Sequence, residues 1–207
     1  MSERRVILIG GAPTVGKSTL AERVAKHFDL PWISTDQIRT IMRKVASRVD
    51  HPRLFNPDGY TPEKFLREFS TDEIVRIEFD QAEAVWTGAS AFIRQDWTWT
   101  RGFVVEGVNI LPHLVARDFM NDPQVEAVFL VDENVERIRR VIHTRGLAGA
   151  ANSYSDDVKD KEVEWVTLFS RRLRADAAKY RYPLVEIRKS AADLDALLAV
   201  LRPADSV

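Results

Sequence analysis

The chain alternates short, wholly apolar runs with longer stretches in which apolar positions recur every three or four residues. The first apolar run covers residues 6–9 and ends at a pair of glycines. Such a run is typical of a parallel strand buried on both faces. Residues 19–28 follow, with apolar side chains at every fourth position on one helix face. The pattern predicts a strand, a glycine-containing turn and a helix at the start of the chain.

The same alternation continues to the end of the chain. The predicted further strands are residues 31–34, 103–105, 125–131 and 184–187. The predicted further helices are residues 38–49, 70–94, 135–143, 162–180 and 191–201, with a helix start also at Thr61-Pro62. Strands that alternate with helices imply a sheet covered on both faces. We therefore expect an α/β, three-layer fold with a five-stranded, mostly parallel sheet.

Two segments differ from this pattern. Residues 37–99 are far too long for a simple connection, so we expect a helical lobe beside the sheet. In its first helix, residues 38–49, the apolar side chains of Ile41, Val45 and Val49 are in register. Residues 145–157 are rich in Gly, Ala, Asn and Ser and predict a loop. We see no repeat, and expect residues 1–207 to form a single domain.

The turn after the first strand fits the phosphate-loop pattern, in which a glycine and four residues precede Gly-Lys-Ser/Thr. Glycines let backbone N–H groups turn toward a phosphate, and the helix that follows adds its positive end. Lys17 would lie along the β- and γ-phosphates of ATP, and Ser18 would hold Mg²⁺ through its hydroxyl group. The residues expected to bind the nucleotide are Gly11, Ala12, Pro13, Thr14, Val15, Gly16, Lys17, Ser18 and Thr19.

Composition narrows the classes of function. Lys and Arg number 30 and Asp and Glu 31, for a net charge of -1, which argues against a dedicated nucleic-acid binder. The absence of cysteine excludes disulfides, zinc thiolates and cysteine nucleophiles. No apolar run approaches the roughly 18 residues that span a membrane, and none resembles a signal peptide. We expect a cytoplasmic protein that does not enter a membrane.

Three motifs together point to a family. The chain lacks Asp-x-x-Gly and Asn-Lys-x-Asp, two patterns of GTPase switch proteins. Its phosphate loop is followed by Ser-Thr-Asp-x-Ile-Arg at positions 34–39 and Glu-Gly-Val at 106–108. In this order the motifs resemble the small-molecule P-loop kinases, above all the kinase domain of 2-phosphoglycerate kinase. The resemblance runs from about residue 5 to residue 187, and implies ATP-dependent transfer of a phosphate to a hydroxyl of a small, anionic metabolite.

The resemblance and the spacing suggest where the acceptor binds, within the lobe of residues 37–99. In the resembled kinases a carboxylate at the position of Asp36 orients the acceptor hydroxyl and takes its proton. The alternative is that Asp36 only caps the helix beginning near residue 37. Arg39 and Arg43 are four residues apart, so they share a helix face and can hold an anionic group on the acceptor. The alternative for both is a solvated basic face.

Further candidates lie at the ends of later elements. Glu106 ends the third strand, where a carboxylate can orient Mg²⁺, although it can also be a merely polar strand end. Asp132 is expected to cap the helix that begins at residue 135. The resemblance places a lid at about residues 144–157, with Arg140 and Arg145 closing over ATP. The spacing of Glu133 and Arg137 also allows an ordinary surface ion pair.

Two other functions stay open. A nucleotide or polynucleotide-end kinase would stack a base on an aromatic side chain such as Trp97 or Phe55. Trp97 and Trp99 both lie near the junction of lobe and sheet. An ATP-binding regulatory module would bind the nucleotide without transferring phosphate. Asp36 and the arginines of the lid favour transfer. The expected partner is therefore a small-molecule acceptor, and no sequence feature specifies an oligomeric state.

Overall fold

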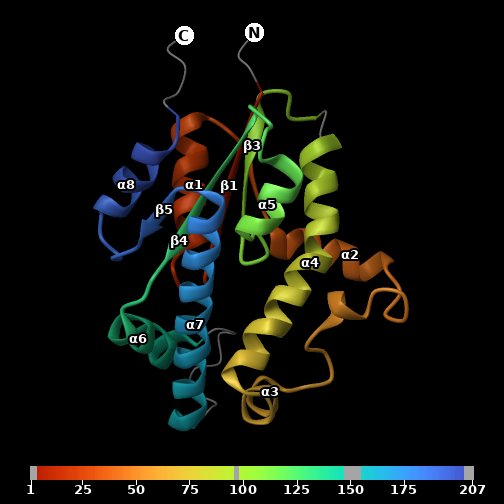
Figure 1. Ribbon diagram of the computed structural model, residues 1–207, viewed down its shortest axis with the longest axis vertical. Coiled ribbons are helices and arrows are strands. Elements are labelled where there is room, and N and C mark those ends of the chain that lie inside the picture. Colours follow the sequence, from red (N-terminus) through yellow and green to blue (C-terminus); the bar gives the residue numbers. More distant parts are fainter. Residues whose placement is uncertain (1–3, 96–97, 147–154, 203–207) are drawn as a thin grey trace.

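A parallel sheet of five strands forms the centre of the computed structural model, which describes residues 4–95, 98–146 and 155–202. Its strands are β1 (Arg5–Gly11), β2 (Trp32–Ser34), β3 (Gly102–Gly107), β4 (Val125–Val131) and β5 (Leu184–Glu186). They lie in the order β2-β3-β1-β4-β5, and every neighbouring pair is parallel (Figure 1). The predicted α/β fold is confirmed, and the described sheet is parallel throughout rather than mostly parallel.

Helices cover both faces of this sheet (Figure 1). On one face lie α1 (Lys17–Phe28) and α8 (Ala192–Val200), and on the other lie α5 (Pro112–Phe119) and α7 (Asp156–Tyr180). The arrangement buries the central apolar run completely, since residues 6–9 of β1 have no exposed surface. That burial explains why the strands have no alternating polar positions. In the described part of the chain, no helix has both the length and the apolar character needed to cross a bilayer.

The segment between β2 and β3 forms the predicted helical lobe. It consists of α2 (Thr35–Val45), the short helix η1 (Pro52–Phe55), α3 (Pro62–Glu68) and α4 (Thr71–Gln95). Figure 1 shows α2, α3 and the first half of α4 beside and below the sheet, with α6 (Val135–Arg145) across from them. Met42 of α2 packs closely on α4, where a Cβ at Gly88 would lie 2.5 Å from the Met42 sulfur. This contact fixes α2 against the long helix.

The prediction for α2 is wrong in its end and in its buried face. The helix ends at Val45 instead of residue 49, and Ile41, Val45 and Val49 are 64%, 83% and 88% exposed. The buried side carries Ile38 and the contact of Met42 with α4. The lobe covers only one side of α2, so apolar spacing alone did not identify which side is covered.

Two helices differ from the sequence prediction. No element was expected between β3 and β4, yet α5 begins there with Pro112 at its first turn and is only eight residues long. The helix α7 begins at Asp156, six residues before the predicted start at 162. Its first turn carries two acidic residues, which favour a helix start. Trp97 and residues 147–154, most of the predicted lid, lie outside the described residues.

One carboxyl group is buried within α7. Glu162 is 3% exposed, and its Oε2 has no hydrogen-bond partner among the described residues. Burial raises the pKa of Glu162 to about 7, and the charge of Lys159 opposes the shift. Because the folded state prefers the protonated form, this group's contribution to stability is fully present below its unfolded pKa of 4.5 and is lost as the pH rises through about 7.

We therefore expect Glu162→Gln to stabilise the protein more at pH 8 than at pH 5, because glutamine stays neutral. The gain at pH 8 should exceed the gain at pH 5 by about 2 kcal/mol. For a chain of this size that corresponds to a rise of roughly 5 °C in Tm. Thermal unfolding at the two pH values measures it, with exposed Glu164→Gln on the same helix as the control. An equal gain at both pH values would show that folding does not raise the pKa of Glu162.

Candidate active site

The predicted phosphate loop forms the turn between β1 and α1. Thr14 and Gly16 have φ angles of 69° and 91°, in the left-handed region. A Cβ at Gly16 would meet no atom within 4 Å, so glycine is needed here for its backbone angle rather than for space. The helix α1 begins directly at Lys17. The structure thus brings the predicted nucleotide-binding residues 11–19 together at the carboxyl end of the central strand.

Lys17 lies where charges from three other elements meet. Its Nζ donates a hydrogen bond to the Ala12 carbonyl oxygen at 2.9 Å, across the loop. Burial lowers the pKa of Lys17, the carboxylates of Glu106 and Asp36 oppose that shift, and Arg145 adds to it. A partly buried cation between two carboxylates and a second cation can bind a phosphate chain, because the phosphate oxygens would replace the weak carbonyl partner.

Ser18 and Glu106 come together beside Lys17. The Ser18 hydroxyl donates to Glu106 Oε1 at 3.1 Å, and Glu106 is only 2% exposed. In the sheet, Glu106 is level with Ile9 of β1 and Ser34 of β2. A hydroxyl and a carboxylate are oxygen ligands that suit Mg²⁺. The described residues contain no group of three His, Cys, Asp or Glu that could hold a metal, so Mg²⁺ here would take its other ligands from phosphate and water.

Glu106→Gln is expected to raise the Mg²⁺ concentration needed for half-maximal activity by about tenfold. The amide is nearly the same size as the carboxylate, but it lacks the charge that attracts the ion. A titration of activity with Mg²⁺ at saturating ATP measures the shift. Glu126→Gln, at the far end of the sheet beside Arg5, serves as the control. An unchanged titration would leave Glu106 as a structural partner of Ser18.

The corner between β2 and α2 places Asp36 at the edge of the sheet. Ser34 caps α2, in a capping box with Gln37, and the Asp36 N–H donates to the Ser34 hydroxyl oxygen at 3.2 Å. The alternative that Asp36 caps this helix is therefore wrong, and its exposed carboxylate is available for another role. A Cβ at Gly107 would lie 1.7 Å from Thr35 Oγ1, so the two predicted motifs pack directly on one another.

Arg39 and Arg43 share a helix face but have different partners. Arg39 Nη2 donates to the Asn56 carbonyl oxygen at 2.8 Å, while its Nε is buried without a partner in the described structure. Arg43 forms an ion pair with Asp58 at 2.5 Å, and Arg48 binds the same carboxylate oxygen. Arg43 therefore holds the loop that follows η1, whereas Arg39 keeps donors that a ligand could use.

The predicted lid arginines lie on α6. Arg145 is the last residue of this helix. Its charge helps to lower the pKa of Lys17, so Arg145 lies near the phosphate loop. Arg140 is exposed on the same helix. Residues 147–154 of the predicted lid, which follow Arg145, lie outside the described residues.

The start of α6 differs from the prediction. Asn134 caps the helix, with its side chain accepting from the Arg137 N–H. Asp132 is 1% exposed and accepts two hydrogen bonds from the Arg137 guanidinium, each 2.7 Å long. The expected cap at Asp132 is therefore wrong, and Arg137 does not form the alternative surface ion pair with Glu133. Glu133 instead forms an ion pair with Arg174 of α7.

The structure adds a residue that the sequence analysis missed. Glu78 of α4 lies near Asp36 and Arg39 of α2. Burial raises the pKa of Glu78 to about 7, Arg39 opposes the shift, and Asp36 adds to it. Glu78 occupies a position four residues after Ile74, which is fully buried. A carboxylate on the core-facing side of a helix was the signal that could have identified it.

The aromatic side chains proposed for base stacking have other partners. Trp99 packs against Phe92 and Phe103, with ring centroids 5.9 and 5.6 Å apart. This cluster lies at the amino end of β3, opposite the phosphate loop. The guanidinium groups of Arg43 and Arg48 lie over the ring of Phe55, 5.1 and 4.8 Å from its centroid. Phe55 thus packs against two guanidinium groups, and Trp99 belongs to a cluster at the other end of the sheet.

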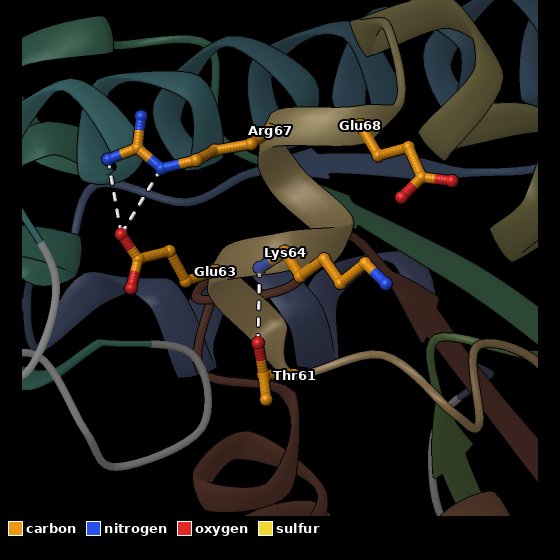
Figure 2. A pocket seen from close by; sticks show the side chains of 5 residues that line it. All are labelled: Thr61, Glu63, Lys64, Arg67 and Glu68. Carbon is orange, nitrogen blue, oxygen red and sulfur yellow. Dashed lines mark hydrogen bonds and ion pairs between the residues drawn. The ribbon is translucent and has the colours of Figure 1, made fainter.

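A hollow of about 390 Å³ lies on α3, away from the predicted site residues. Figure 2 shows its lining, Thr61, Glu63, Lys64, Arg67 and Glu68. Arg67 bonds Glu63 on the same helix and also reaches Asp157 and Ser155 at the start of α7. These contacts tie the lobe to the last residues of the predicted lid segment, where α7 begins, so the hollow lies at the junction of the lobe and α7.

Comparison with known proteins identifies relatives that are all named as kinases of small metabolites. No family model matches the chain. A 2-phosphoglycerate kinase from Methanocaldococcus jannaschii is 29% identical over 95% of this chain and 62% of its own length. One from Methanothermobacter thermautotrophicus is 38% identical over 66% of this chain and 46% of its own length. A mevalonate-3-phosphate 5-kinase from Thermoplasma acidophilum is 25% identical over 65% of this chain and 66% of its own length. The chain thus spans less than two thirds of each of these relatives.

Solved structures support the fold. A gluconokinase from Sinorhizobium meliloti superposes with a TM-score of 0.52 at 14% identity, over 96% of this chain and 94% of its own. At that identity the likeness establishes the shared three-layer architecture. The chain is accordingly similar in sequence to small-metabolite kinases and has the fold of the P-loop kinases.

Proposed function

We propose that the chain is an ATP-dependent phosphotransferase that moves the γ-phosphate to a hydroxyl of a small anionic metabolite, such as 2-phosphoglycerate. The observation that supports this most is the setting of Lys17, with Glu106 and Asp36 as the two carboxylates acting on it. One belongs to the expected Mg²⁺ side and the other to the acceptor lobe. A phosphate bound at Lys17 would therefore lie between metal and acceptor.

Each residue then has a distinct role. The loop of residues 11–19 binds the phosphates of ATP, and Lys17 offsets their charge. Mg²⁺, held from Ser18 and Glu106, would neutralise charge on the β- and γ-phosphates. The acceptor hydroxyl oxygen forms the new bond to the γ-phosphorus while the bond to the β-phosphate oxygen breaks and ADP leaves. Asp36 orients the hydroxyl and takes its proton.

Two arginines complete the site on the nucleotide side. Arg145 and Arg140 on α6 would approach the transferring phosphate when the lid closes, and would offset its charge. Closure would also exclude water and so limit wasteful hydrolysis of ATP. The effect of Arg145 on Lys17 supports this role for Arg145. We place the enzyme in the cytoplasm, where ATP and phosphorylated metabolites meet.

The anionic acceptor is inferred from the lobe. Arg39 lies one turn beyond Asp36 on α2 and keeps a buried Nε without a partner in the described structure. Guanidinium groups favour carboxylates and phosphates through paired, charge-assisted hydrogen bonds. Arg43 would add positive charge behind Arg39. The relatives named above carry phosphorylated acceptors in their names, which agrees with this chemistry.

Arg39→Ala is expected to raise the acceptor KM by at least about tenfold and to leave the ATP KM nearly unchanged. Arg39→Lys should restore only part of the loss, because lysine cannot supply the planar fork. The measurement is ADP release with neutral and anionic hydroxyl compounds, comparing wild type with each variant. Exposed Lys44→Ala on the same helix is the control. A neutral best acceptor, or weaker ATP binding in Arg39→Ala, would contradict this placement.

A further inference from the structure

Polar side chains from two helices converge on the loop after η1. Arg39 of α2 and Gln81 of α4 both donate to the Asn56 carbonyl oxygen. Asp36 lies one turn before Arg39, and Glu78 lies one turn before Gln81. Because the shared carbonyl oxygen holds the two helices in this register, Asp36 and Glu78 lie on the same side of the lobe as the guanidinium group. The electrostatic effects agree with this placement, since the charges of Glu78 and Asp36 both act to raise the pKa of Arg39, and that of Arg39 in turn acts to lower the pKa of Glu78.

Glu78 and Arg39 have unused capacity for hydrogen bonds. Arg39 Nε is buried without a partner, and Glu78 forms no hydrogen bond or ion pair with any residue that the structure describes. The Glu78 side chain is nevertheless only partly buried, so a small molecule can reach it. Buried polar groups are ordinarily paired, and those that are not often serve a ligand.

The protonation of Glu78 fits a role as a donor. Burial raises its pKa to about 7, so much of it is protonated at neutral pH. A protonated carboxyl group donates one hydrogen bond, whereas a carboxylate beside an anionic ligand would repel it. The charged groups that act on it are Arg39 and Asp36 of α2. Other charged residues that pair with α4 do so elsewhere along it, namely His113 and Arg117 of α5 with Glu83, Asp118 of α5 with Arg94, and Arg172 of α7 with Asp72.

We propose that Glu78 is a further acceptor-binding residue, whose protonated carboxyl group donates a hydrogen bond to the anionic group that Arg39 holds. The proposal rests on the proposed function, because it assigns Glu78 to the acceptor side of that site. The proposal predicts that the phosphate or carboxylate of the acceptor contacts both the Arg39 guanidinium group and the protonated carboxyl group of Glu78. Binding of the acceptor then weakens as Glu78 ionises.

The experiment measures binding, so that it does not depend on turnover. Calorimetry with 2-phosphoglycerate, in the presence of ADP and Mg²⁺, gives Kd at pH 6.5 and 8.5 for wild type, Glu78→Gln and Glu78→Ala. Glutamine keeps a neutral donor at both pH values, and alanine has none. Asp80→Asn, a half-buried position two residues along α4, is the matched control. Thermal unfolding and ADP affinity confirm that each variant is folded.

The ratio of the wild-type Kd to the Glu78→Gln Kd removes the acceptor's own ionisation from the comparison. This ratio should rise about tenfold between pH 6.5 and 8.5, and Glu78→Ala should weaken binding about tenfold at pH 6.5. Asp80→Asn should follow wild type. A constant ratio, or no binding of 2-phosphoglycerate by wild type, would overturn the proposal. Binding with the expected ratio but without phosphate transfer would instead overturn the proposed function and leave Glu78 as a ligand-binding residue.

Discussion

Lys17→Ala is expected to remove nearly all phosphoryl transfer, by about a thousandfold or more. The charges of Glu106 and Asp36 both act on the Lys17 ammonium group, which would bind phosphate, and no other lysine is on the loop. In the ligand-free protein its Nζ has a single described hydrogen bond, to the Ala12 carbonyl oxygen. The Tm without ligand should therefore change by no more than a few degrees.

Initial rates and thermal unfolding, each measured with and without ATP and Mg²⁺, separate these two effects. Wild type should gain thermal stability from ATP and Mg²⁺, and Lys17→Ala should lose most of that gain. Lys26→Ala, an exposed position on the same helix, controls for the removal of a positive charge from α1. Ordinary turnover in Lys17→Ala would contradict the assignment of the ATP site.

Asp36→Asn is expected to lower kcat by roughly 10²- to 10⁴-fold, with a much smaller change in the KM for ATP. The side chain is exposed at the corner between β2 and α2, and its charge acts on Lys17. An amide can still orient the acceptor hydroxyl, but it cannot take the proton. The stability of the protein should hardly change, because Ser34 and Gln37 cap the helix.

Ser34→Ala is the matched control for Asp36→Asn. It removes the cap and should cost about 1 kcal/mol of stability while leaving the carboxylate in place. The two variants are therefore expected to show opposite patterns in kinetics and denaturation. Loss of stability without loss of kcat in Asp36→Asn would show that the carboxylate has only a structural role.

The sequence predicted the sheet and the phosphate loop because both depend on local patterns. The central strands are apolar runs buried on two faces, and the loop needs glycine at a left-handed position such as Gly16. The two motifs around Asp36 and Glu106 were also visible, since each lies at the end of a strand. Their close packing, which requires Gly107 beside Thr35, could only be seen in the folded chain.

The remaining differences come from tertiary contacts. Apolar spacing in α2 did not reveal that α4 covers only the side with Ile38 and Met42. Asp132 was expected at a helix cap, but Arg137 returns from the following turn to bind it. The proposed role of Glu78 depends on a helix some forty residues before it in the sequence. Spacing along the chain contains none of this information.

The central claim is transfer of phosphate from ATP to an anionic hydroxyl compound. Wild-type protein with ATP labelled in the γ-phosphate, Mg²⁺ and 2-phosphoglycerate, followed by separation of the products, tests it most directly. The account predicts that the label appears in the acceptor, in amounts equal to the ADP formed, with little ADP when the acceptor is left out. Release of the label only as inorganic phosphate, or no transfer to any anionic hydroxyl compound in a screen, would contradict it.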